Sequence, residues 1–186
     1  MKKNIIGLAA IAIFFSGCST IPKKEAKVID SAVEGLEYQC AGMVEYTSKD
    51  GTLSCRHMPL AFKIGEIKLG IIYDMPADGI ILPQDIVGVS RDNIKNEDVI
   101  KITVLLQSLD EDKNASNGIK ISKETREKLS EFIDLQKTSL EDLKDLVEAQ
   151  LGKTIFKNPK SALEHLQSSM KKYNIFSANV NLEDLE

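Results

Sequence analysis

Residues 60–71 read LAFKIGEIKLGI, and this stretch predicts the fold of the N-terminal half. Apolar residues recur at every second position on both sides of Gly65-Glu66, which is the period of a half-buried strand. A glycine in the first position of a two-residue loop suits a type II′ turn. Pairing the chain about this turn puts three apolar pairs on one face, namely Ile64 with Ile67, Phe62 with Leu69 and Leu60 with Ile71. We therefore expect an antiparallel hairpin with one buried face.

A second hairpin is predicted upstream, about Asp50-Gly51. This dipeptide is typical of type I′ turns, because both central residues then take a positive φ. The register places Tyr46 opposite Cys55, and it turns Cys55 toward the buried face. Before this hairpin, the alternation over residues 36–40 predicts another strand, and Ala41-Gly42 is expected to form a bulge or bend after it. Short apolar runs at 80–82 and 85–89, separated by Pro83, complete an antiparallel β-module.

Four helices are predicted in the C-terminal half, each after a residue that caps helix N-termini. The caps are Asn96, Ser122, Ser139 and the Asn158-Pro159 pair. Apolar residues at helical spacing follow each cap: Val99, Ile102, Leu105, Leu106 and Leu109; Leu129, Phe132 and Ile133; Leu140, Leu143, Leu146 and Val147; Ala162, Leu163, Leu166 and Met170. The β-branched residues of the first segment leave a strand as an alternative there.

These patterns predict an α+β fold, with a small antiparallel, disulfide-braced β-module followed by a helical C-terminal half. The expected boundaries are a signal peptide at 1–17, a lipidated tether at 18–31, the β-module at 32–92, the helical region at 93–175 and an acidic tail at 176–186.

The first twenty residues have the three parts of a bacterial export signal. Lys2 and Lys3 precede eleven residues without a polar side chain, a run too short for a bilayer-spanning helix of about 20 residues. The run ends in Phe15-Ser16-Gly17-Cys18, which resembles the lipobox of bacterial lipoproteins. That resemblance implies lipid attachment to Cys18, and Ser19 in place of Asp favours the outer membrane over the inner one. A plain secretory signal with a coincidental cysteine is the alternative.

The chain has three cysteines, and a lipid on Cys18 leaves Cys40 and Cys55 as a pair. In an oxidising compartment such a pair is typical of a structural disulfide. A redox-active or metal-binding pair is the alternative, but the two residues do not form a Cys-x-x-Cys motif.

Part of the mature chain resembles a module that recurs in uncharacterised bacterial envelope and surface lipoproteins. The residues that carry this resemblance are Gly35-Leu-Glu-Tyr-Gln-Cys40, Phe62-Lys-Ile-Gly65 with Leu69-Gly70, and Leu105-Leu-Gln-Ser-Leu-Asp-Glu-Asp112 with Asn117-Gly-Ile119. The resemblance implies a surface-associated module and carries neither an activity nor a ligand.

Asp110, Asp112 and Asn114 stand at positions 1, 3 and 5 of a loop, which is how a calcium-binding loop begins. The rest of that pattern is missing, since Ala115 replaces the turn glycine and Ile121 replaces the bidentate glutamate. The two interpretations are a weak Ca²⁺ site and a solvated acidic loop.

The function expected from these features is binding rather than catalysis. The formal charge is −4, and without Lys2 and Lys3 the 22 remaining basic residues face 28 acidic ones, giving −6. That charge disfavours nucleic acid as a partner. The serine-hydrolase and zinc-protease motifs are missing, and only two histidines are present. We expect a non-catalytic outer-membrane lipoprotein that binds an envelope protein. The alternatives are a Ca²⁺-dependent or small-ligand recognition module, and an accessory lipoprotein of a secretion or surface machine.

Overall fold

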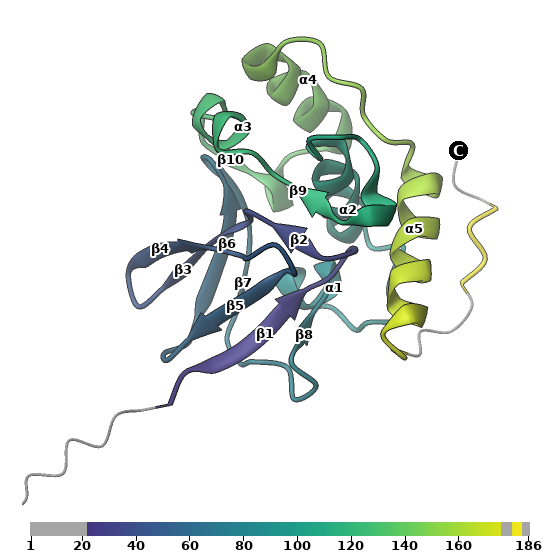
Figure 1. The fold of residues 1–186 in the computed structure, drawn as a ribbon. Helices are drawn as coiled ribbons and strands as arrows, with labels where there is room; N and C mark the ends of the chain where they lie inside the picture. Colours follow the sequence, from purple (N-terminus) through teal and green to yellow (C-terminus); the bar gives the residue numbers. More distant parts are fainter. Residues whose placement is uncertain (1–21, 176–179, 184–186) are drawn as a thin grey trace, which may run out of the picture.

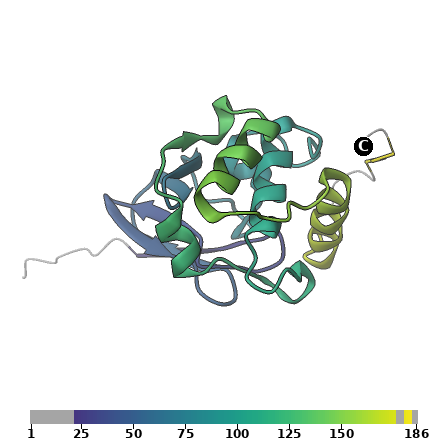
Figure 2. The ribbon, with the colours of Figure 1, turned by 90° about the horizontal axis from the view of Figure 1, so that it is seen from above.

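The computed structural model describes residues 22–175 and 180–183, and its fold is α+β as predicted (Figure 1). Most strands lie in the N-terminal half and the long helices lie in the C-terminal half. In both views α2 (Glu97–Ser108) lies between the strands and α5 (Pro159–Lys172) (Figures 1 and 2). No helix among the described residues is long and apolar enough to cross a bilayer.

The largest sheet has five strands in the order β10-β7-β6-β3-β4. Their bounds are Ile133–Asp134 for β10, Ile67–Ile72 for β7, Leu60–Ile64 for β6, Glu37–Cys40 for β3 and Met43–Tyr46 for β4. The predicted hairpin of residues 60–71 forms its centre, and Ile64 pairs with Ile67 as expected. Its buried face supplies several of the largest fully buried side chains, including Phe62.

The register of this hairpin departs from the prediction beyond Lys63. The pairing shifts between Phe62 and Lys63, so that Phe62 lies opposite Gly70 rather than Leu69, and Leu60 lies opposite Ile72 rather than Ile71. Gly70 also lies against the backbone carbonyl of Ile86 in α1 (Pro83–Val87), where a β-carbon would clash. A residue without a side chain therefore stands where α1 packs against β7.

A second sheet has the order β5-β1-β8, and it corrects the prediction of a tether over 18–31. Lys24–Val28 forms β1, which pairs antiparallel with β5 (Thr52–Cys55) and parallel with β8 (Ile80–Ile81). Val28 is only 1% exposed, so this segment belongs to the core. The prediction failed because a charged segment with one face buried resembles a polar linker in sequence.

The hairpin predicted about Asp50-Gly51 is wrong, because its two arms join different sheets. Tyr46 belongs to β4, which pairs with β3, whereas Cys55 belongs to β5, which pairs with β1. The turn with two positive φ angles lies instead at Ala41 (50°) and Gly42 (83°), and it makes β3 and β4 the hairpin. The expected bulge at this dipeptide is therefore a turn.

Four predicted helices form, and the strand alternative for residues 96–109 is excluded. Asn96, Ser122, Ser139 and Asn158 each accept a backbone N–H with the side chain, ahead of α2, α3 (Lys123–Lys128), α4 (Leu140–Leu151) and α5. The second helix is shorter than expected, because Ile133 belongs to β10 and Phe132 is 72% exposed. Residues 85–87 are helical in α1, not a strand.

The remaining elements are short. β2 (Val33–Glu34) pairs in parallel with β9 (Ile119–Lys120), and two 3₁₀ turns cover Ala115–Asn117 and Leu135–Lys137. The core has two parts: one lies between the sheets, α2 and α4, and the other gathers residues of α2 and α5, including Val99, Leu163 and Leu166.

The predicted disulfide is present. Cys40 and Cys55 are bonded, with their Cα atoms 5.8 Å apart. Cys40 ends β3 of the five-stranded sheet and Cys55 ends β5 of the three-stranded sheet. The bond therefore joins the two sheets at one end of the fold.

Replacing both cysteines by alanine is expected to lower the free energy of unfolding by about 3 kcal/mol, the chain-entropy value for a closed loop of about 15 residues. Urea denaturation of the oxidised protein and of the double variant measures this difference. The reduced protein is the matched control, because it lacks the bond but keeps the side chains. Equal stability of all three forms would contradict the prediction.

Candidate functional site

The predicted site residues fall into three places. Cys18 lies outside the described residues. Cys40 and Cys55 form the disulfide. Asp110, Asp112 and Asn114 lie in the loop after α2, beside a hollow of about 250 Å³.

This acidic loop is closed by its own hydrogen bonds. Asp112 accepts from the backbone N–H of Asn114 and from Nδ2 of Asn117, both at 2.9 Å. Asp110 is 1% exposed, and its Oδ1 accepts from the backbone N–H of Lys120 at 2.8 Å. These are the contacts of a self-supporting turn, in which backbone and side-chain donors occupy oxygens that a metal ion would need.

One buried carboxylate oxygen in the loop has no hydrogen-bond partner among the described residues. Asp110 Oδ2 is buried and accepts no hydrogen bond from the described residues. Burial raises the pKa of Asp110, and the negative charge of Asp112 adds to this effect. Calcium in proteins takes six to eight oxygen ligands, and the described residues hold no cluster of three or more His, Cys, Asp or Glu suited to a metal. Calcium binding at Asp110, Asp112 and Asn114 stays a prediction.

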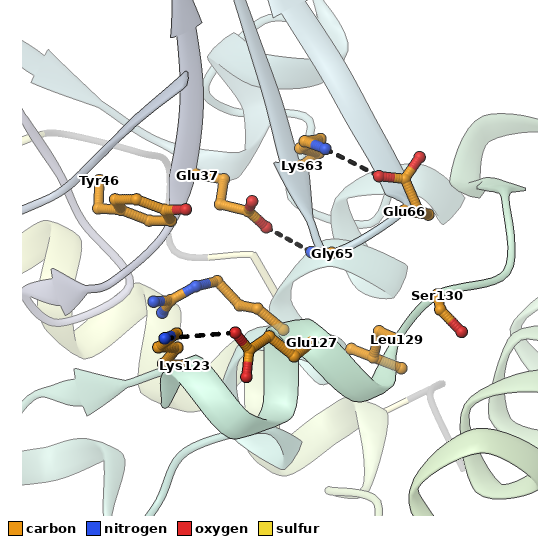
Figure 3. A pocket seen from close by; sticks show the side chains of 10 residues that line it. Glu37, Tyr46, Lys63, Gly65, Glu66, Lys123, Glu127, Leu129 and Ser130 are labelled. Atoms are coloured by element: carbon orange, nitrogen blue, oxygen red, sulfur yellow. Dashed lines mark hydrogen bonds and ion pairs between the residues drawn. The ribbon is translucent and has the colours of Figure 1, made fainter. Parts of the chain in front are cut away.

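A larger hollow, of about 370 Å³, lies where α3 meets the turn of the β6–β7 hairpin (Figure 3). We call it the seam pocket, and its lining residues are Glu37, Tyr46, Lys63, Gly65, Glu66, Lys123, Arg126, Glu127, Leu129 and Ser130. The backbone N–H of Glu66 donates to the carbonyl of Leu129 at 2.7 Å. A β-carbon on Gly65 would clash with that same carbonyl, so a glycine is needed for the helix to approach this closely.

One wall of the seam pocket is a stacked pair. The Arg126 guanidinium lies over the Tyr46 ring, with Cζ 4.5 Å from the ring centroid. The Arg126 Nη1 also donates to the backbone carbonyls of Gly35 and Ile121, at 2.9 and 2.5 Å. These two hydrogen bonds fix the position of the guanidinium. The half-exposed Tyr46 ring therefore stacks on a cation that is held in place.

The floor of the pocket holds a buried carboxylate. Glu37 is 7% exposed, and it accepts a hydrogen bond from the backbone N–H of Gly65 (Figure 3). Burial raises the pKa of Glu37, while the Gly65 N–H and the positive charges of Lys63 and Arg126 oppose that shift. The carboxylate is thus shielded from water and partly neutralised by its surroundings.

The rim carries paired charges. Lys63 contacts Glu66 at 3.0 Å and Lys123 contacts Glu127 at 3.4 Å. With Glu37 and Arg126, the pocket holds three basic and three acidic side chains beside an aromatic ring. Such a lining can take a group that presents both charges or a peptide backbone, because donors and acceptors are both available.

The pocket opens beside an unpaired sheet edge. β4 is the last strand of its sheet, and the described part of the chain gives it no partner on its outer side. Val44 and Tyr46 of this strand are 45% and 51% exposed. A sheet edge of this kind can add an extended peptide by main-chain hydrogen bonds.

A buried polar cluster ties the turn after β1 to two helices. Both carboxylate oxygens of Asp30 accept from Nε2 of Gln107, at 3.1 and 3.0 Å. Ser31 donates its backbone N–H to Ser169 Oγ at 3.1 Å, and its hydroxyl lies 3.0 Å from His165 Nε2. Desolvation lowers the pKa of His165 and the positive charge of Lys157 lowers it further. These contacts anchor the turn, in which Ser31 has a φ of 61°.

The sequence patterns predicted neither the seam pocket nor the buried polar cluster around Asp30 and Ser31. The partners are far apart in the chain: Tyr46 and Arg126 are 80 residues apart, and Ser31 and His165 are 134 residues apart. The only local signal was Gly65, which the hairpin pattern already explained.

Comparison of the chain with known protein families, with curated proteins and with solved structures finds no match.

Folding stability is expected to fall as the pH rises from about 4 to 7, because burial raises the pKa of Asp30 to about 7. The unfolded chain releases this proton near pH 4, whereas the folded chain keeps it until about pH 7. The stability that Asp30 contributes is thus fully present below pH 4 and is lost above pH 7, a change of up to roughly 4 kcal/mol. Urea denaturation at pH 4, 5.5 and 8 measures it.

Asp30→Asn is the control, since it removes this proton and leaves His165 to titrate in both proteins. We expect the variant to lack the loss of stability, whatever its absolute stability. The same pH dependence in both proteins would contradict the assignment to Asp30.

Proposed function

We propose that this chain is a non-catalytic outer-membrane lipoprotein that is anchored through Cys18 and binds a protein partner in the cell envelope. The observation that carries the proposal is the use of the cysteines. Cys40 and Cys55 form one disulfide. The remaining cysteine of the sequence, Cys18, stands at the end of the lipobox-like sequence. Disulfides persist in oxidising compartments, which is the environment that export across the inner membrane would provide.

The seam pocket and the β4 edge support a binding role. They lie side by side, because Tyr46 belongs to both. An extended segment of a partner would pair with β4, while one of its side chains or a chain end would enter the pocket. The mixed charges of the lining suit a peptide, which offers main-chain donors and acceptors together with charged groups.

The position of the pocket fits an anchored protein. The pocket lies at the turn of the β6–β7 hairpin, whereas β1 begins next to Cys55, where the opposite ends of the strands meet. A partner would therefore approach the end of the fold that is remote from the N-terminal segment (Figure 1).

Intact mass measurement of the native protein tests the anchor. We expect a chain that begins at Cys18 and carries the added mass of acyl chains. Cys18→Ala should lack this mass and leave the membrane fraction, because two or more acyl chains are what hold such a protein durably on a bilayer. Formation of the Cys40–Cys55 bond in the variant serves as the control for folding. A free thiol at Cys18, or an intact Met1 on a soluble species, would overturn the proposal.

Site-specific photo-crosslinking in cells tests the binding surface. A photoreactive residue in place of Val44, on the outer edge of β4, is expected to give a discrete protein adduct. The same residue in place of Ser168, which is exposed on α5, is the matched position and should not give that adduct.

Variants of Tyr46 test whether the seam pocket itself contributes to binding of the partner. Tyr46→Ala removes the ring from Arg126 and should weaken the Val44 adduct several-fold, whereas Tyr46→Phe keeps the ring face and should preserve it. Equal adducts from both variants, or from both crosslinking positions, would rule out this surface.

A further inference from the structure

We infer that the end of the fold at the Cys40–Cys55 disulfide rests on the bilayer surface, with Met43 and Tyr73 among the lipid headgroups. Basic side chains on the same end would face anionic lipid phosphates. The inference rests on the proposed lipid anchor at Cys18, and it goes beyond that anchor by fixing which surface of the domain touches the membrane.

Six strand ends meet at this disulfide, and we call the surface they form the anchor end. Lys24 at the start of β1 pairs with Cys55 at the end of β5, and Cys55 is bonded to Cys40 at the end of β3. From Cys40 the pairing continues to Met43 at the start of β4, to Leu60 at the start of β6, and from Leu60 to Ile72 at the end of β7. The turns and loops beyond these residues therefore project from one end of the molecule.

The length of chain before β1 keeps this end near the membrane. Cys18 stands six residues before Lys24, the first residue of β1. A fully extended chain spans at most about 3.4 Å per residue, so the start of β1 lies within about 20 Å of an acylated Cys18. The start of β1 and the end of β5 lie together at the lower left of Figure 1, where the chain enters the fold.

Two large apolar side chains are exposed on the anchor end. Met43 is 61% exposed next to the β3–β4 turn, and Tyr73 is 70% exposed directly after β7. Tyrosine is enriched where proteins meet the bilayer interface, because its ring is apolar and its hydroxyl is polar. Exposed on a monomer in water, both side chains would gain free energy from transfer into the headgroup region.

The charge of the anchor end differs from that of the whole chain. Lys23, Lys24 and Arg56 are exposed here, against the exposed carboxylates of Glu25, Asp74 and Asp78. Arg91 pairs with Asp78 and Asp85, so the charges of this end are about balanced on a chain whose formal charge is −4. Near an anionic bilayer each basic residue contributes about fivefold to the docking equilibrium.

The opposite end supplies a matched control position. Phe132 is 72% exposed and precedes Ile133, which pairs with Ile67 at the far end of β7 from Tyr73. Since β7 has six residues, about 20 Å of strand separates the two positions.

Tryptophan fluorescence tests the inference, since the chain has no Trp of its own. The mature acylated protein, carrying Tyr73→Trp, is reconstituted into phosphatidylethanolamine–phosphatidylglycerol vesicles whose acyl chains are brominated. We expect strong quenching and a blue-shifted emission for Tyr73→Trp and for Met43→Trp. Phe132→Trp should be quenched little, although its exposure in water is equal.

The outcomes separate the orientation from the anchor. Vesicle flotation with unquenched Tyr73→Trp and Met43→Trp would overturn the orientation and leave the anchor intact. Loss of flotation would overturn the anchor and the orientation together. Equal quenching at all three positions would also overturn the inference, because the domain would then have no preferred face.

A second comparison tests the charges. Replacing Lys23, Lys24 and Arg56 by Gln should reduce the quenching of Tyr73→Trp on vesicles with phosphatidylglycerol, while flotation is retained. On phosphatidylcholine vesicles the two proteins should be quenched alike. Unchanged quenching on the anionic vesicles would rule out the contribution of the basic residues.

Discussion

The Cys40–Cys55 bond is the constraint on which the rest of the structure depends. It joins the last residue of β3 in the five-stranded sheet to the last residue of β5 in the three-stranded sheet. The strands of the smaller sheet are short, since β8 has two residues and β5 and β1 have four and five, and apart from the bond this sheet is held by buried side chains such as Val28, Leu53 and Ile81. The bond fixes the relation of the two sheets, and with it the place where the N-terminal segment enters the fold.

Local signals in the sequence predicted the helices well, because a helix N-terminus is decided by neighbours in the chain. Asn96, Ser139 and Asn158 each present a side-chain oxygen to an N–H two or three residues later, and the structure contains all three caps. The β6–β7 hairpin was equally local, and its turn residues Gly65-Glu66 join strands that pair as neighbours in the chain. Where one short segment contains both the turn and the paired strands, the sequence pattern predicts the hairpin and its turn, although it did not predict the shift between Phe62 and Lys63 that changes the register beyond Lys63.

The predictions that were wrong concern strands whose partners are not neighbours in the chain. β1 pairs with residues of β5 that are 25 to 31 positions away, and its sequence gives no sign of that partner. Asp50-Gly51 has a strong turn signal, yet the Asp50 carboxylate accepts from Ser48 Oγ and from the Thr52 N–H, which closes a local turn without aligning two strands. Ala41-Gly42, a weaker signal, makes the hairpin because both residues take a positive φ. Turn propensity alone therefore did not decide which strands pair.

The candidate site was hidden for the same reason, since Tyr46, Glu37 and Arg126 come from two strands and a distant helix. Their placement follows from the β6–β7 hairpin, which pairs Lys63 with Glu37 at one end and Leu60 with Cys40 at the other. The two ends of this hairpin thus have different surroundings, a pocket of paired charges at the turn and the disulfide with the start of β1 at the open end.

A rigid strand pair between the two ends has a mechanical consequence. With the proposed anchor at Cys18, at most about 20 Å of chain separates the bilayer from the start of β1. About 20 Å of strand then separates the anchor end from the pocket. Since neither distance can lengthen much without breaking sheet hydrogen bonds, a partner would meet the seam pocket within a narrow range of heights above the membrane. A short tether on a stiff sheet would therefore select partners that are themselves close to the bilayer.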